Sequence, residues 1–151
     1  MEKKAIIKKN AFMRNGTAKK IVFHNNAQIV PDNNVIDLSE GNNGSVIAWY
    51  TDYNTMHVAP VYGNKIYANK DSSYMFAECY SLSEIDGIEN LDTSNVEFMR
   101  GMFMNCISLI KIDVSNFNTS SIKDISYMFS NCAMLKELDF SKFNAPKIEK
   151  C

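Results

Sequence analysis

The segment Gly101-Met-Phe-Met-Asn-Cys106 decides the fold, because the same pattern stands at two other places in the chain. Its counterparts are Tyr74-Met-Phe-Ala-Glu-Cys79 and Tyr127-Met-Phe-Ser-Asn-Cys132, so that the cysteines are 27 and 26 residues apart. A leucine follows each cysteine by three residues, and an Ile-Asp or Leu-Asp pair follows each leucine. Self-similarity at a fixed period is typical of stacked repeats. The sequence therefore predicts about three repeats over residues 71–151, the last one incomplete. Because the Met-Phe pair has the same place in every repeat, Phe76, Phe103 and Phe129 are expected to stack as a core spine.

Each unit contains the spacing of one short strand. In Leu109-x-x-Ile112-x-Val114 the alternate side chains would point inward, and one such strand per turn would form a parallel sheet. The later apolar positions, such as Ile122, Ile125 and Met128, indicate a helical or irregular return path. The first unit carries one extra residue near Gly87, which we interpret as a local bulge. The expected fold class is an α/β leucine-rich-repeat solenoid.

Residues 1–70 lack the repeat and are expected to form an N-terminal β-rich cap. They contain β-prone runs at 21–23, 35–38, 46–50 and 56–58, separated by turns rich in Asn and Gly. The segment 52–54 is expected to join the last two runs as a hairpin. The end turn of a repeat array exposes core residues, and a small β unit would cover it. Trp49, inside an apolar run, is expected to be a core residue.

The repeat resembles that of the BspA-like leucine-rich-repeat surface proteins of bacteria. The resemblance covers about residues 71–151 and extends weakly to 44–49 and 65–69. It implies surface attachment or protein binding, a cell-surface or secreted location, and no catalytic residues. No signal peptide is expected in the first residues, because the apolar run 5–7 is interrupted by Lys8 and Lys9. A cytoplasmic protein-interaction scaffold on the same fold is therefore the alternative.

Composition and motifs exclude several other classes of function. The net charge is -1, with 16 basic and 17 acidic residues, and no basic stripe is present, so we expect no nucleic-acid partner. No apolar stretch approaches the length of a membrane-spanning helix. The two histidines, His24 and His57, belong to no recognisable triad or metal motif. We expect no enzyme activity, no cofactor and no metal, and we expect the three repeat cysteines to be buried and reduced.

A protein partner, if it docks on the repeats, is expected on the outward face of the predicted sheet. The candidate protein-binding residues form two columns, Glu84, Lys111 and Glu137 beside Asp86, Asp113 and Asp139. A second interpretation is that each aspartate hydrogen-bonds locally and fixes its own turn. End-to-end self-association is also expected at an open C-terminal end. A remote alternative function is a carrier that is modified at Cys151.

Overall fold

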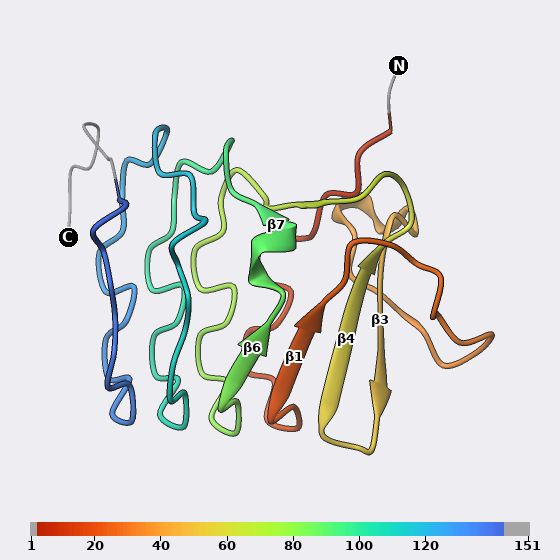
Figure 1. The fold of residues 1–151 in the computed structure, drawn as a ribbon. Coiled ribbons are helices and arrows are strands. Elements are labelled where there is room, and N and C mark those ends of the chain that lie inside the picture. The colour runs from red at the N-terminus through yellow and green to blue at the C-terminus, as the bar shows by residue number, and fades with distance from the viewer. Residues whose placement is uncertain (1–2, 144–151) are drawn as a thin grey trace.

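The structure is a computed structural model that describes residues 3–143. A strand-rich N-terminal part lies beside a stack of extended turns, which continue the same sheet surface (Figure 1). The strands are β1 (Lys20–Phe23), β2 (Ile36–Asp37), β3 (Val46–Thr51), β4 (Thr55–Pro60), β5 (Ile66–Tyr67), β6 (Glu84–Asp86) and β7 (Leu91–Asp92). Two 3-10 helices, η1 (Glu40–Asn42) and η2 (Ile88–Asn90), complete the regular elements.

The larger sheet is mixed and has the strand order β2-β3-β4-β1-β6. Strand β1 pairs in parallel with β4 on one side and with β6 on the other, whereas β3 pairs antiparallel with both β2 and β4. A second sheet consists of β5 and β7 in parallel. The β-prone runs predicted in the first 60 residues are all found as strands, and the predicted hairpin at 52–54 joins β3 to β4. Trp49 is buried, as expected.

The predicted α/β leucine-rich-repeat solenoid is wrong. Residues 3–143 contain no α-helix, and the main sheet is a small mixed one rather than a parallel sheet with one strand per turn. Of the three repeat units in the described residues, only the first forms a strand, β6, at the predicted place. The corresponding segments of the next two units are joined by a single β-bridge between Lys111 and Glu137.

The return path is not helical because every second backbone N–H group bonds to the neighbouring turn, while the N–H groups between them bond three residues back in their own turn. Phe76 N–H donates to Met102 O, and Phe103 N–H donates to Met128 O, both at 2.8 Å. Residues with positive φ also recur at fixed places in this path and end any helical run. One such place is occupied by Tyr74, Gly101 and Tyr127, with φ between 58° and 61°.

A turn of the same form precedes the repeats and is not visible as a repeat in the sequence. Phe12 N–H donates to Met75 O at 3.0 Å, and Arg14 N–H donates to Ala77 O at 2.8 Å, which is the hydrogen-bond register found between later turns. Arg14 has a φ of 64°, close to the 61° of Glu78 in the corresponding place. The segment from residue 10 to the end of β1 is therefore structurally equivalent to a repeat turn.

A row of phenylalanines forms the centre of the core. The ring centroids of Phe12 and Phe76 are 4.9 Å apart, those of Phe76 and Phe103 4.9 Å, and those of Phe103 and Phe129 5.1 Å, with interplanar angles of 10°, 5° and 3°. We call these four residues the phenylalanine spine. The first three are fully buried, whereas Phe129 is half-buried. The expected stacking of the repeat phenylalanines is thus confirmed and begins one turn earlier than expected.

The repeat cysteines lie beside the spine as free thiols. Each thiol donates to the carbonyl of a spine residue in the preceding turn, Cys79 to Phe12 O at 3.0 Å and Cys106 to Phe76 O at 3.1 Å. Burial raises the pKa of the Cys79 thiol to about 12 and also raises that of Cys106. The predicted burial is confirmed for these two, while Cys132 is half-buried. Thiols of this kind remain protonated at neutral pH.

The predicted bulge in the first unit is wrong. The extra residue lies instead at the 3-10 helix η2. Gly87 precedes this helix with a φ of 73°, and a Cβ placed there would lie 2.2 Å from Phe23 O.

No helix among the described residues is long and apolar enough to cross a membrane. Cys151 and the predicted open C-terminal end beyond about Lys142 lie almost wholly outside the described residues.

Candidate functional site

The outward face of β6 and of the two segments that follow it in the stack is hollowed into a groove. Its volume is about 610 Å³, and it is partly open to solvent. We call it the acidic groove; its lining residues are Ile85, Asp86, Gly87, Ile88, Glu89, Lys111, Ile112, Asp113, Glu137, Leu138 and Asp139. The groove thus contains five of the six predicted binding residues, and Glu84 lies at the outer side of β6, next to Lys20.

Charge in the groove is strongly unbalanced. Its lining carries five carboxylates, which belong to Asp86, Glu89, Asp113, Glu137 and Asp139, against the single ammonium group of Lys111. The apolar floor comes from the residues that alternate with them, among them Ile85 and Ile112, which are 9% and 8% exposed. Charges of one sign gathered in a concave surface reinforce one another's potential and attract counter-charges from solution.

Two of the groove carboxylates also hold their own turns. The backbone N–H of Ser115 donates to Oδ1 of Asp113 at 2.9 Å, and that of Ser141 donates to Oδ1 of Asp139 at 2.8 Å. Hydrogen bonds from the side chain and backbone of Ser115 lower the pKa of Asp113, and those from the backbone and side chain of Ser141 lower the pKa of Asp139, because a carboxylate that accepts hydrogen bonds is stabilised in its charged form. The local structural role considered for the aspartates is therefore present, and it leaves the negative charge at the surface.

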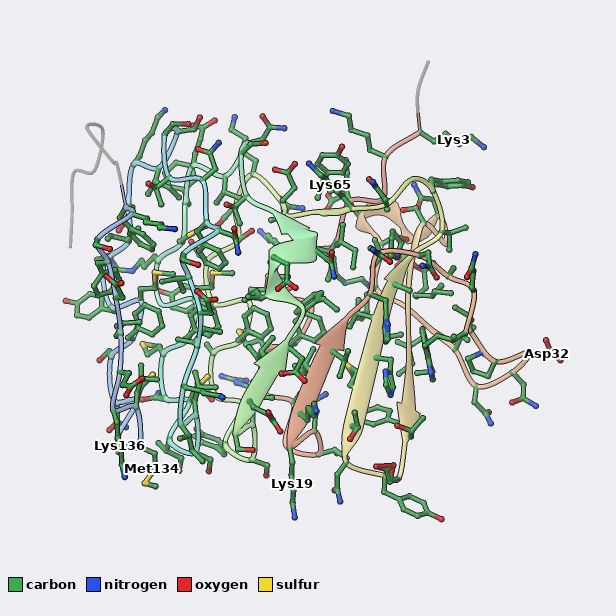
Figure 2. The ribbon with its side chains drawn as sticks, in the orientation of Figure 1. Lys3, Lys19, Asp32, Lys65, Met134 and Lys136 are labelled. Carbon is green, nitrogen blue, oxygen red and sulfur yellow. The ribbon has the colours of Figure 1, made fainter. Side chains whose placement is uncertain are left out.

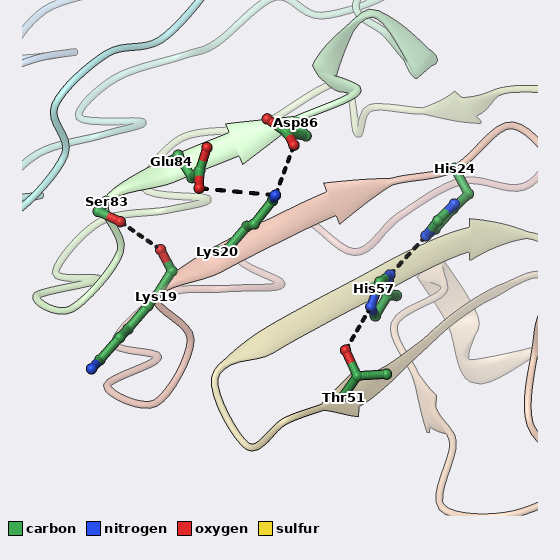
Figure 3. A network of polar contacts seen from close by, with 8 residues as sticks. All are labelled: Lys19, Lys20, His24, Thr51, His57, Ser83, Glu84 and Asp86. Carbon is green, nitrogen blue, oxygen red and sulfur yellow. Dashed lines mark hydrogen bonds and ion pairs between the residues drawn. The ribbon is translucent and has the colours of Figure 1, made fainter.

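Asp86 is held differently from the other two aspartates. Asp86 has no serine two residues later, where Asp113 and Asp139 have one. Its carboxylate lies instead 3.0 Å from Nζ of Lys20 on β1. Lys20 also lies 3.9 Å from Glu84 (Figure 3). The hydrogen bond to Asp86, followed by the charges of Asp86 and Glu84, raises the pKa of Lys20. The end of the acidic groove at Asp86 is thus partly neutralised by Lys20.

A second polar cluster lies on the same sheet, on the far side of Lys20. His24 Nε2 and His57 Nδ1 are 2.8 Å apart, and His57 Nε2 lies 2.9 Å from Thr51 Oγ1 (Figure 3). Trp49 packs beside both imidazoles, with ring centroids 5.7 Å from His24 and 5.3 Å from His57. This chain of hydroxyl and two imidazoles can hold or pass a proton.

Both histidines stand out in the sequence, which indicates no partner for either of them. They meet because β1 pairs with β4 in the register that places Val22 opposite His57, and the side chain of His24, the residue that follows β1, reaches His57 across the strands. These two strands are separated by the whole β2–β3 segment, and no local pattern gives their register. Glu89 was also missed, because it belongs to the extra residues of the first unit. Among residues 3–143, no group of three or more His, Cys, Asp or Glu side chains is arranged to hold a metal ion.

Comparison with known proteins corrects the predicted BspA-like membership. Residues 65–151, more than half of the chain, match the family described as "Mycoplasma protein of unknown function, DUF285". That is a different family from the BspA-like leucine-rich-repeat proteins, and the predicted resemblance is wrong. The cell-surface or secreted location was derived from that resemblance and loses its basis with it. No curated protein and no solved structure matches the chain significantly.

Proposed function

This chain belongs to the DUF285 family, and we propose that it is a non-enzymatic protein-binding module whose acidic groove takes a basic, extended segment of a partner protein. The observation that carries the proposal is the groove itself, with five carboxylates and one lysine over an apolar floor. Apolar area supplies affinity, while the carboxylates select partners of the opposite charge and speed their encounter.

Rigidity of the groove supports a binding role. The floor residues belong to the same turns as the phenylalanine spine, and the carboxylates of Asp113 and Asp139 are fixed by their hydrogen bonds to Ser115 and Ser141. A surface that is already ordered loses little conformational entropy when a partner binds. A basic side chain could therefore approach these carboxylates without rearrangement of the turns that carry them.

The charge of the groove can be removed without removing its turns. Asn118 shows how, because its Oδ1 accepts the N–H of Ser120 at 3.0 Å in the manner of the aspartates. The double variant Asp113→Asn, Asp139→Asn should keep both turns and lose two negative charges. We expect a short peptide of alternating lysine and threonine to bind the native protein in a salt-dependent way, and to bind the double variant several-fold more weakly with a shallower salt dependence.

Asp71→Asn is the matched control. Asp71 holds the same kind of turn through the N–H of Ser73 at 3.0 Å, but it lies outside the lining of the acidic groove. This variant should bind the peptide as the native protein does, and a glutamate–threonine peptide should bind none of the three proteins. Equal peptide affinity in the native protein and the double variant, at unchanged thermal stability, would reject the groove as the binding surface.

A further inference from the structure

The His24–His57 contact depends on how many protons the two imidazoles carry. The facing nitrogens, Nε2 of His24 and Nδ1 of His57, are 2.8 Å apart, so one of them must donate a proton and the other must accept it. The pair can exist with both rings neutral. It can also carry one extra proton, because a charged His57 still donates to His24 while its Nε2 donates to Thr51 Oγ1 at 2.9 Å. With both rings charged, each facing nitrogen carries a hydrogen and the contact must break.

His24 is also the last residue held to the sheet before the chain leaves it. Its N–H donates to Val58 O at 2.8 Å, and the next regular element is β2 at Ile36. Residues 25–34 make hydrogen bonds only among themselves within the described chain, such as Val30 N–H to Ala27 O. The segment projects from the sheet, with Asp32 near its tip (Figure 2). Ile29 is 60% exposed, so the segment is packed weakly.

We propose that the His24–His57 pair is a proton-operated latch, which holds the start of segment 25–35 against the sheet while at most one imidazole is charged and releases it when both are. The contact with Trp49 makes the release visible, because this residue is 4% exposed and both imidazoles pack beside its ring. Loss of His24 from the cluster uncovers one side of that ring. Since Ile29 and Val35 lie in the freed segment, the change alters an exposed apolar surface.

The groups around the pair set the pH range. Burial is the main cause that lowers the pKa of both imidazoles; for His24 the charge of His57 adds to it, and for His57 Lys20 on β1 lowers and Asp52 in the β3–β4 turn raises the value. Glu84 and Asp86 of β6 pair with Lys20, while β3 contributes only the neutral Thr51 and Trp49. Segment 25–35 contains one ionisable residue, Asp32. Release of segment 25–35 is therefore expected below about pH 6.5, which is the ordinary pKa of histidine.

The test follows Trp49, the single tryptophan of the chain, and the backbone of residues 25–35 from about pH 7.5 to about pH 5, above the range in which carboxylates titrate. Nitrogen NMR of the imidazoles reports each protonation step. On the second step, we expect acrylamide quenching of Trp49 fluorescence to rise several-fold and amide exchange in residues 25–35 to quicken. Failure of the second imidazole to become charged above about pH 5 would overturn the latch, as would its charging with no change in quenching or exchange.

His24→Gln and Thr51→Val separate the latch from a general effect of pH. Glutamine can still bond to His57 but cannot take a second charge, so this variant should show no pH-dependent rise in quenching. Thr51→Val keeps both imidazoles and should retain the transition, displaced in pH because the charged His57 loses its outer acceptor. A transition of equal size in native protein and in His24→Gln would contradict the proposal. The readouts do not involve the acidic groove, so they are independent of the proposed function.

Discussion

The turn formed by residues 10–23 and the turn that begins at Gly101 have the same backbone form but almost no sequence in common. Both place a phenylalanine in the spine, both use a residue with positive φ two places later, and both bond to the next turn in one register. The cysteine of the repeat is replaced by Asn15, whose amide donates to Tyr50 instead. The comparison indicates that the spine and the backbone ladder define the turn, and that the other repeated residues are accessory.

Alanine in place of a spine phenylalanine is the strongest way to break that comparison. Phe103→Ala and Phe12→Ala should each lower the free energy of unfolding by roughly 3–5 kcal/mol, because each empties a fully buried site between stacked rings. Urea denaturation followed by circular dichroism measures the loss. Phe129→Ala, at a half-buried site, should cost less. If Phe12→Ala costs under about 1 kcal/mol, the first turn does not share the core of the repeats.

Much of the fold was predictable where the signal is local. The β-prone runs and the 52–54 hairpin were found from alternation and turn residues, and the spacing of the Met-Phe pairs gave the stacked rings of Phe76 and Phe103. The helical return path was predicted wrongly because apolar spacing in the return segment fits a helix equally well. What decides against a helix is a left-handed residue in each turn, and at Tyr74 and Tyr127 that residue is not a glycine.

The site was predictable to the same degree. Repetition placed Asp86, Asp113 and Asp139 in one column, and the structure finds all three along one groove. The hollow itself depends on η2 and Glu89, which belong to the irregular part of the first unit. The histidine pair depends on the register of two strands more than thirty residues apart in the chain, as the separation of 33 residues between the two rings shows. Such long-range pairing leaves no mark in a single sequence.

Two glycines of the repeat region, Gly87 and Gly101, offer a finer comparison, because both have positive φ. A Cβ at Gly87 would meet the backbone oxygen of Phe23 at 2.2 Å, whereas one at Gly101 would meet the ring of Tyr74 at 2.6 Å. Side chains can move aside more readily than backbone. Gly87→Ala should therefore destabilise by more than Gly101→Ala, with roughly 1–3 kcal/mol expected for the latter.

Removal of the obstructing ring distinguishes the two glycine sites. In the background Tyr74→Ala, the added cost of Gly101→Ala should fall, since the positive φ of this position is tolerated by Tyr74 and Tyr127 in neighbouring turns. The cost of Gly87→Ala should be the same in both backgrounds. A double-mutant cycle with no coupling between positions 74 and 101 would show that the strain at Gly101 lies in the backbone and not in contact with the ring.

The smallest effect is expected in the acidic groove, where structure and charge can be separated at one residue. Asp113→Asn should change the free energy of unfolding at neutral pH by less than about 0.5 kcal/mol, because asparagine accepts the Ser115 N–H as Asn118 accepts that of Ser120. Asp113→Ala loses that bond and should cost more, up to about 1 kcal/mol at this exposed site.

The charge of Asp113 can also be tested by its pH dependence. The pKa of Asp113 is lowered in the folded protein, so the stability that its charged form contributes is present above the ordinary pKa of aspartate and disappears as the pH falls through the pKa of the folded protein. Native stability should therefore decline more steeply with acid than that of Asp113→Asn, and parallel stability curves for the two proteins between about pH 5 and about pH 2 would contradict a favourable role of the charge in this turn.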